Sequence, residues 1–194
     1  MIKLNRKLIL ASNSPRRKEI LSNAGFEFTV LVKEIDESFP IDMPVIEVPS
    51  YLSSKKADSF SSEIDENIVL TADTIVAIDK LILNKPTDEK GAKDMLLKLS
   101  GRKHVVHTGF CILTKNSKKC FVDTTEVWFK QLTDNEIDYY IETCKPFDKA
   151  GAYGVQDFIG MIGIDKIEGS YFTVMGLPIH RVYDELCEFM VWGK

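Results

Sequence analysis

Near its start the chain reads Leu8-Ile9-Leu10-Ala11-Ser12-Asn13-Ser14-Pro15-Arg16-Arg17-Lys18-Glu19-Ile20-Leu21, and this segment is the strongest indication of its fold. It predicts a short apolar strand, a turn rich in hydroxyl groups and then a helix. We expect Ser14 to be the N-cap of that helix, and Pro15 suits its first position because the missing N–H is no loss there. A strand that passes directly into a helix is typical of α/β proteins.

Two arginines stand where a helix normally avoids positive charge. Arg16 and Arg17 fall in the first turn, where the helix dipole disfavours cations and a sequence selected only for stability would have Asp or Glu. Unpaired N–H groups at the helix start, two hydroxyls and two guanidinium groups together suit a polyphosphate. The stretch therefore predicts an anion-binding site made by Ser12, Ser14, Arg16 and Arg17.

Composition places the chain among ordinary globular proteins. It has 194 residues, of which 44% are hydrophobic and 28% charged. We expect a single domain over residues 1–194, large enough to form two closely packed lobes. The net charge of −4 argues against a protein that coats nucleic acid.

Location and redox state follow from what the sequence does not contain. Its apolar stretches are strand-sized and its first residues lack the apolar core of a signal peptide, so we expect a cytoplasmic protein with no membrane contact. The four cysteines form no C-x-x-C pair and are expected to be reduced, with Cys111 and Cys120 packed as thiols across a hairpin. The three histidines lack zinc-like spacing.

Strand-like and helix-like segments alternate along the rest of the chain. Strands are expected over residues 7–12, 26–33, 68–78 and 81–83, a hairpin over 104–114 and 120–129, and short strands within 151–176. Helices are expected from Pro15 to a C-cap at Gly25, over about 48–61, from a cap at Thr87 to near Gly101, from the capping box at Thr133 to about 143, and over 178–190. This order predicts a mixed α/β sheet flanked by helices.

Asp73 is a carboxylate inside the apolar run 68–78. Burying it without a partner would cost several kcal/mol, so the strand must end there or a cation must compensate. The structural interpretation is a strand-edge Asp that caps a turn. The lysines at positions 56 and 85 favour the functional interpretation, in which they are cations for the same anionic site.

Five motifs, in order along residues 8–178, resemble those of the Maf family of nucleoside-triphosphate pyrophosphatases. The opening resembles S-x-S-P-R-R, and Thr71-Ala72-Asp73-Thr74-Ile75-Val76 resembles the family's A-D-T strand. The others are Asn84-Lys85-Pro86 (usually G-K-P), Asp148-Lys149-Ala150-Gly151-Ala152-Tyr153-Gly154-Val155-Gln156 (D-K-A-G-A-Y-x-x-Q), and Gly169-Ser170-Tyr171 followed by Gly176-Leu177-Pro178. The resemblance implies a Maf/ITPase-like fold, with two lobes and an active-site cleft between them.

The resemblance also implies a reaction and its residues. The expected reaction converts a nucleoside triphosphate to monophosphate and diphosphate, with a divalent cation, Mg²⁺ or Mn²⁺. Asp73 would activate water and bind the metal with Glu37, which residue type alone does not distinguish from Glu34 or Asp36. Lys56 and Lys85 would join the arginines on the phosphates. Arg16, Thr74 and Gln156 would select the base, in a combination similar to that of the dTTP and UTP subgroup.

Several alternatives stay open at this stage. Asp148 and Lys149 form either an active-site pair or a structural ion pair beside Gly151. The same chemistry could act on 7-methyl-GTP or inosine triphosphate, and the family's link to septum formation leaves a non-enzymatic regulator as a second class. A binding module would not need Glu37, Asp73, Lys56 and Lys85 together. The resemblance further implies a homodimer.

Overall fold

A seven-stranded mixed sheet organises the protein in the computed structural model, which describes residues 2–191. The strand order is β2-β1-β3-β5-β6-β7, and β4 pairs with β3. Strand β1 runs parallel to β2 and β3, whereas β4 is antiparallel to β3 and β7 is antiparallel to β6. The strands are β1 Lys7–Leu10, β2 Thr29–Val30, β3 Asn67–Ile78, β4 Leu81–Leu83, β5 Lys103–Leu113, β6 Lys118–Phe129 and β7 Ile164–Glu168.

The chain divides into two compact units. Unit 1 comprises Met1–Asp73, Thr108–Asp123 and Gly176–Lys194, and unit 2 comprises Thr74–His107 and Thr124–Met175. Strands β3, β5 and β6 each contribute residues to both units, and in β3 the boundary lies between Asp73 and Thr74. The mixed α/β fold predicted from the sequence is confirmed. The single domain over residues 1–194 and the cleft between lobes stay predictions.

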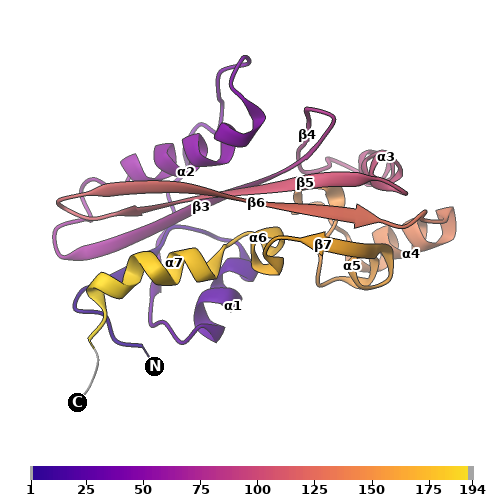
Figure 1. Cartoon of the computed structure of the whole chain (residues 1–194). Helices are drawn as coiled ribbons and strands as arrows, with labels where there is room; N and C mark the ends of the chain where they lie inside the picture. Colours follow the sequence, from indigo (N-terminus) through magenta and orange to yellow (C-terminus); the bar gives the residue numbers. More distant parts are fainter. Residues whose placement is uncertain (1, 192–194) are drawn as a thin grey trace. The chain divides into compact units, whose positions relative to one another are not determined.

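Unit 1 has helices on both faces of its strands. Helix α2 (Val48–Asp58) lies on one face, and α1 (Pro15–Asn23) and α7 (Ile179–Leu186) lie on the other, as Figure 1 shows. A 3-10 turn, η1 (Val45–Glu47), leads into α2, and η3 (Cys187–Phe189) follows α7. The core between α2 and the strands includes Ile9, Ala57, Phe60, Val69 and Leu113. This packing places the C-terminal half of α2 beside β3.

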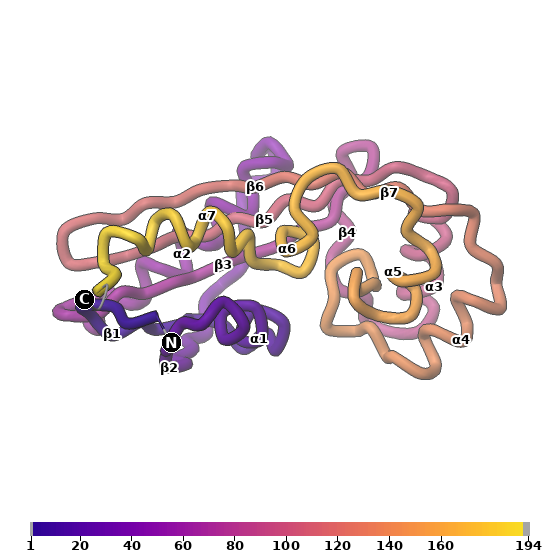
Figure 2. The backbone as a smooth tube through the Cα atoms, turned by 60° about the horizontal axis from the view of Figure 1, so that its bottom comes forward, coloured from indigo at the N-terminus to yellow at the C-terminus, as the bar shows by residue number. Residues whose placement is uncertain are grey.

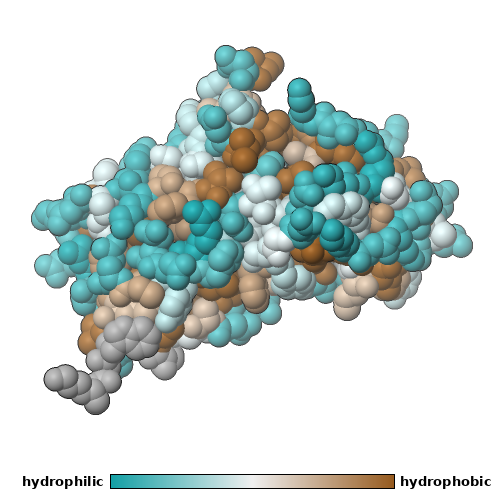
Figure 3. All heavy atoms as spheres, in the orientation of Figure 1, coloured by the Kyte–Doolittle hydropathy of each residue, from teal (hydrophilic) through white to brown (hydrophobic). Residues whose placement is uncertain are grey.

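The segment between β2 and α2 projects from unit 1 (Figure 1). Figure 3 shows hydrophobic side chains at its tip, while much of the surface on this face is hydrophilic. Ile41 and Ile46, which lie in this segment, are exposed. Glu37 comes from the same segment, so its position depends on contacts with α2.

Unit 2 is built around a core that includes Val76, Leu96, Phe129, Tyr140 and Tyr153. Its helices α3 Glu89–Leu99, α4 Asp134–Cys144 and α5 Phe158–Gly163 lie near one another in Figure 2. The short elements η2 Ala150–Ala152 and α6 Tyr171–Met175 also belong to this unit. Helix α4 begins with the predicted capping box, in which the Thr133 hydroxyl accepts from the Glu136 N–H and Glu136 accepts from the Thr133 N–H.

The structure corrects several predicted boundaries. The strand expected over 26–33 is only Thr29–Val30, because Val30 and its neighbours are exposed at the sheet edge. Helix α3 is capped by Asp88 rather than Thr87, since the Asp88 carboxylate accepts from the Gly91 N–H at 2.7 Å. The region 151–176, expected to hold short strands, contains mainly α5, α6 and one strand, β7.

The thiol prediction is wrong for two cysteines. Cys111 in β5 and Cys120 in β6 form a disulfide, with their Cα atoms 4.1 Å apart. The hairpin brings the two positions opposite each other at a distance that a disulfide can bridge. Cys144 and Cys187 are free cysteines, as expected. No helix within residues 2–191 is long and apolar enough to cross a membrane.

Candidate active site

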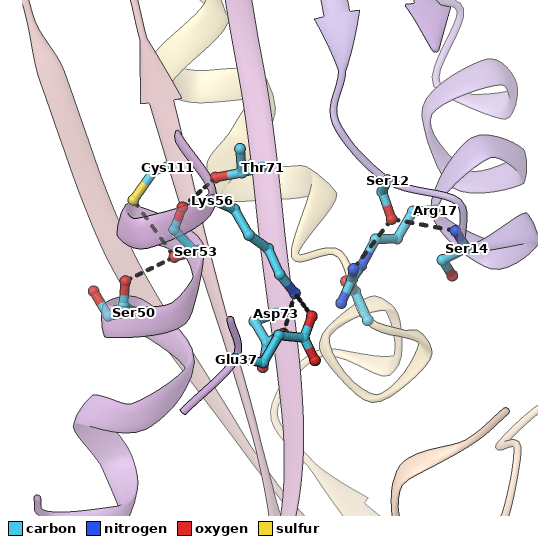
Figure 4. A network of polar contacts seen from close by, with 11 residues as sticks. Ser12, Ser14, Arg17, Glu37, Ser50, Ser53, Lys56, Thr71, Asp73 and Cys111 are labelled. Atoms are coloured by element: carbon cyan, nitrogen blue, oxygen red, sulfur yellow. Dashed lines mark hydrogen bonds and ion pairs between the residues drawn. The ribbon is translucent and has the colours of Figure 1, made fainter. Parts of the chain in front are cut away.

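A lysine on α2 joins two carboxylates of unit 1. The Lys56 ammonium lies 2.6 Å from Asp73 Oδ1 on β3 and 2.8 Å from Glu37 Oε1 in the projecting segment (Figure 4). The side chains of Lys56 and Asp73 are largely buried, at 16% and 13% exposure, whereas Glu37 is 57% exposed. The cation that the sequence requires near Asp73 is therefore Lys56, and Asp73 does not cap a turn.

The projecting segment has two neighbouring acids with different partners. Asp36 accepts from Lys55 at 3.0 Å and from the Ser38 N–H at 2.9 Å. Hydrogen bonds from Ser38 and Lys55 lower the pKa of Asp36 to about 2. Glu37 turns instead to Lys56 and thus to Asp73. Contacts distinguish these two acids where residue type does not.

The start of α1 is held by Ser12 rather than by Ser14. Ser12 is buried, and its Oγ accepts from the Ser14 N–H and from Arg17 Nη1, each at 3.2 Å. Ser14 occupies the predicted N-cap position, but its hydroxyl makes no capping hydrogen bond. The predicted N-cap residue is therefore confirmed, and the Ser12 side chain accepts from the backbone N–H of that residue. Figure 4 shows Ser12, Ser14 and Arg17 grouped at this turn.

Arg17 links the opening motif to the last one. Its Nε donates to the Gly176 carbonyl at 2.8 Å, so the Gly-Leu-Pro segment positions the guanidinium. Gly176 has a φ of 106°, a left-handed conformation that favours glycine. Sequence reasoning gave this glycine no role, although a glycine before Leu-Pro in a motif is a signal for a special backbone conformation.

Arg17 also lies within electrostatic reach of the carboxylates. Burial lowers the pKa of its guanidinium, while the charges of Asp73 and Glu37 raise it and the charge of Arg16 lowers it further. These influences place Arg16, Arg17, Asp73 and Glu37 in one electrostatic neighbourhood of unit 1.

The Glu37–Asp73 pair fits a divalent cation held mainly by substrate. Both carboxylates contact one ammonium, so their oxygens lie only a few ångströms apart. Oxygen ligands from one or two carboxylates, completed by phosphate and water, are typical of Mg²⁺ sites. No group of three or more His, Cys, Asp or Glu suited to a metal occurs among residues 2–191. Glu37 and Asp73 are thus the two neighbouring carboxylates that could take part in such a site.

In unit 2, Gly151 brings three of the motifs together. Its N–H donates to the Asn84 carbonyl at 3.2 Å, and a Cβ at this position would lie 2.9 Å from the Val76 side chain. Its φ of 69° also favours glycine. The A-D-T strand, the Asn84-Lys85-Pro86 segment and the Asp148–Gln156 segment therefore meet at one residue. The Lys85 side chain is exposed beside this junction.

Gln156 has a buried amide oxygen in need of a donor. Its Oε1 has no hydrogen-bond partner among residues 2–191. The turn around it is held by Asp157, which accepts from the Tyr140 hydroxyl at 2.9 Å, while that hydroxyl accepts from the Gly154 N–H at 3.1 Å. Burial, with Asp157 second, raises the pKa of Tyr140, which keeps the hydroxyl protonated as a donor. Asp157 was missed by sequence reasoning.

The predicted pair of Asp148 and Lys149 in unit 2 has a third member, Asp157. Lys149 donates to Asp148 at 2.9 Å and lies 3.5 Å from Asp157. Lys149 is only 12% exposed, so its ammonium is committed to two carboxylates. This arrangement favours the structural interpretation of the pair.

The predicted site residues fall into two sets. Unit 1 holds Ser12, Ser14, Arg16, Arg17, Glu37, Lys56 and Asp73, and unit 2 holds Thr74, Lys85, Asp148, Lys149 and Gln156. The two sets are joined in the chain by the consecutive residues Asp73 and Thr74 of β3. Direct contacts join Glu37, Lys56 and Asp73, and separately Ser12, Ser14 and Arg17.

Comparison with known proteins identifies the class to which this arrangement belongs. The model of the Maf-like protein family matches residues 7–189, and the chain belongs to that family. The dTTP/UTP pyrophosphatase of Phocaeicola vulgatus is 48% identical over 182 residues, which cover 93% of this chain and 94% of that protein. The dTTP/UTP pyrophosphatase of Cytophaga hutchinsonii is 46% identical over 182 residues, covering 94% and 84% respectively.

Among solved structures, the Ham1 protein of Staphylococcus aureus aligns with a TM-score of 0.48 and 12% identity. The alignment covers 64% of this chain and 72% of that one.

Proposed function

We propose that the protein hydrolyses dTTP and UTP, together with modified pyrimidine forms, to the monophosphate and diphosphate. The observation that carries this proposal is the Lys56 ammonium held between Asp73 and Glu37, in the same electrostatic neighbourhood as Arg16 and Arg17. Relatives that share nearly half of their residues with this chain carry that name.

In the proposed reaction, cations of unit 1 bind the triphosphate. Arg17 is fixed by Ser12 and the Gly176 carbonyl, so it presents its guanidinium with little loss of rotamer freedom. A bound triphosphate would give Lys56 a third anionic partner besides its two carboxylates. Lys85, exposed in unit 2, is assigned to the same phosphates. Such groups stabilise the charge that develops during phosphoryl transfer.

Asp73 is the proposed proton acceptor. The oxygen of a water molecule forms a bond to a phosphorus of the α–β anhydride, the bridging P–O bond breaks, and the water proton passes to the Asp73 carboxylate. Glu37 and Asp73 are the residues that would hold Mg²⁺ or Mn²⁺, and the cation would neutralise phosphate charge when bound. No oxidant or other co-reactant is needed.

Recognition of the base is assigned to Arg16, Thr74 and Gln156. Thymine and uracil present an N–H donor flanked by two carbonyl acceptors, and the amide of Gln156 offers the complementary acceptor and donor. The unpartnered Oε1 of Gln156 supports this assignment, since a buried acceptor without a donor is costly until a ligand satisfies it. Asp148 and Lys149 are proposed to support the segment that carries Gln156.

A nucleotide panel tests the proposal. Purified protein is incubated with dTTP, UTP, CTP, inosine triphosphate and 7-methyl-GTP, with Mg²⁺, with Mn²⁺ and with a chelator, and diphosphate is measured. We expect diphosphate from dTTP and UTP only when a divalent cation is present. Preference for a purine would refute the proposed base, and no hydrolysis of any nucleotide would favour a regulator.

Two further proposals concern the setting of this activity. We propose a homodimer that acts in the cytoplasm, where nucleoside triphosphates are abundant. Sedimentation measures the oligomeric state directly. Alkylation of cysteines in intact cells, before lysis, reports whether Cys111 and Cys120 are disulfide-bonded in that compartment.

A further inference from the structure

Helix α2 touches the strands of unit 1 through three contacts near its N-terminal half. The Thr71 hydroxyl on β3 donates to the Ser53 carbonyl at 2.7 Å (Figure 4). Ser53 Oγ lies 3.4 Å from Cys111 Sγ on β5 and donates to the Ser50 carbonyl at 2.9 Å. A Cβ on Gly109 would lie 2.3 Å from the Pro49 backbone, so α2 and β5 approach closely there.

Of these contacts, the hydroxyl of Thr71 is the unusual one. Thr71 is fully buried, and the residues before it in β3, Ile68, Val69 and Leu70, are buried and apolar. A carbonyl inside a helix normally accepts from the N–H four residues later, so Ser53 here receives a second donor from outside the helix. Valine would fill the same volume in a strand without a polar group to satisfy. The hydroxyl therefore serves this contact.

The contact lies directly beside the Lys56–Asp73 ion pair. Thr71 precedes Asp73 by two residues, so both side chains point to the same face of β3. Ser53 precedes Lys56 by three residues, so both lie on neighbouring turns of one side of α2. Thr71–Ser53 and Asp73–Lys56 are thus successive contacts along one helix–strand interface, 2.7 Å and 2.6 Å long.

We propose that Thr71 is a positioning residue, which fixes the height of α2 along β3 and thereby holds the Lys56 ammonium at the Asp73 carboxylate. The effect passes through the backbone of α2, since Thr71 donates to a carbonyl and not to a side chain. Lys56 has a long, flexible side chain, so the position of its ammonium depends on the position of α2 along β3. This inference rests on the proposed function for its kinetic consequence, but not for its structural one.

Kinetics of Thr71→Val and Thr71→Ser test the proposal. We expect Thr71→Val to lower kcat/KM for dTTP about tenfold, in line with loss of one buried hydrogen bond beside the site. Thr71→Ser keeps the hydroxyl and should restore most of the activity. Thr114→Val is the matched control, because Thr114 is also a buried threonine of unit 1, and its hydroxyl bonds to Ser117 within its own turn. Should Thr71→Val fail to fold, Thr71→Ala replaces it.

A double-mutant cycle separates positioning from general destabilisation. In a Lys56→Ala background, Thr71→Val should have no further effect on kcat/KM, because the group it positions is absent. The same tenfold loss in both backgrounds would overturn the proposal, as would wild-type kinetics for Thr71→Val or failure of Thr71→Ser to restore activity.

A spectroscopic readout keeps the inference independent of the reaction. We expect the ammonium resonance of Lys56, in protein labelled with ¹⁵N-lysine, to be protected from exchange in the wild type and in Thr114→Val but not in Thr71→Val. Equal protection in all three would overturn the positioning role. Absence of any nucleotide hydrolysis by the wild type would remove the proposed function, while this measurement would still decide the role of Thr71.

Discussion

The two sets of site residues differ in how far their polar groups are already satisfied. In unit 1, Lys56 contacts two carboxylates and Arg17 contacts Ser12 and the Gly176 carbonyl. In unit 2, Gln156 keeps a buried amide oxygen with no hydrogen-bond partner among residues 2–191. The first set is held together by charge before any ligand binds. The second contains a group that only a ligand or water would satisfy.

In the proposed function, the two sets would prepare for a substrate in two ways. Pairing offsets part of the cost of burying the charges of Lys56 and Asp73 in the free protein, and a triphosphate would add anionic partners for cations that are already oriented. An unpaired buried acceptor costs roughly 1–3 kcal/mol in the free protein, and the cost is recovered only by a ligand with a donor in the right place. We therefore expect the first set to act mainly on turnover and the second on discrimination between bases.

Removal of the Asp73 charge is the strongest test of the unit 1 set. Asp73→Asn keeps the size of the side chain but cannot accept the proton, so we expect kcat to fall by about 10³-fold or more. Steady-state kinetics with dTTP and Mg²⁺ measure the loss. The matched control is Asp65→Asn, an exposed carboxylate 3.6 Å from Lys115, which should leave the rate unchanged. Unchanged turnover in Asp73→Asn would remove Asp73 as the proton acceptor.

Truncation of Arg16 should be the next largest effect. We expect Arg16→Ala to lower kcat/KM about 10²-fold, because a charge near the phosphates is lost while Arg17 keeps its own contacts. Arg102→Ala removes an exposed guanidinium paired with Asp79 and serves as the control. Near wild-type kinetics for Arg16→Ala would contradict the anion-binding role of the α1 start.

The sequence indicated the unit 1 set better than the unit 2 set, for physical reasons. A carboxylate within an apolar strand needs a compensating cation, and two arginines at a helix start suit an anion, so Asp73 and Arg16 could be recognised from their local sequence. Contacts between residues far apart in the sequence could not be recognised in this way. The bond from Arg17 to the Gly176 carbonyl spans 159 residues, and that from Thr71 to the Ser53 carbonyl depends on where α2 packs.

The differences between the predictions from the sequence and the structure also have local causes. Ser14 is the N-cap that its residue type and position predict, but its hydroxyl makes no capping hydrogen bond, and Ser12 accepts from its N–H. Cys111 and Cys120 were expected to be reduced on grounds of spacing and compartment, whereas hairpin register sets their separation. The short helices of 158–175 replaced expected strands because glycine-rich segments carry little periodicity.

A pH-dependent effect on stability is expected from a buried histidine of unit 2. Burial lowers the pKa of His104 to about 3, and its Nε2 lies 2.8 Å from the Tyr153 hydroxyl. Since the unfolded chain binds this proton near pH 6.5 and the folded protein does not, stability is lost as pH falls from about 6.5 toward 3, by about 1.4 kcal/mol per pH unit. Urea unfolding at pH 7 and pH 5 should therefore show a loss of about 2 kcal/mol from this residue.

His104→Gln should remove that part of the pH dependence, because glutamine keeps an N–H near Tyr153 without titrating. His180→Gln, at an exposed histidine, is the control and should retain it. An identical pH dependence in His104→Gln and the wild type would show that the buried imidazole is not its source.

The smallest expected effect concerns Gln156, and it tests directly whether the two sets of site residues differ. Gln156→Leu removes the unpartnered Oε1, so we expect the free energy of unfolding to rise by about 1 kcal/mol while kcat/KM for dTTP and UTP falls about tenfold. Opposite changes in stability and activity are the mark of a group kept for a ligand. Gln131→Leu, at an exposed glutamine, should change neither quantity by as much. A variant that loses stability and keeps its base preference would mean that Gln156 is satisfied within the folded chain, and the contrast between the two sets would then disappear.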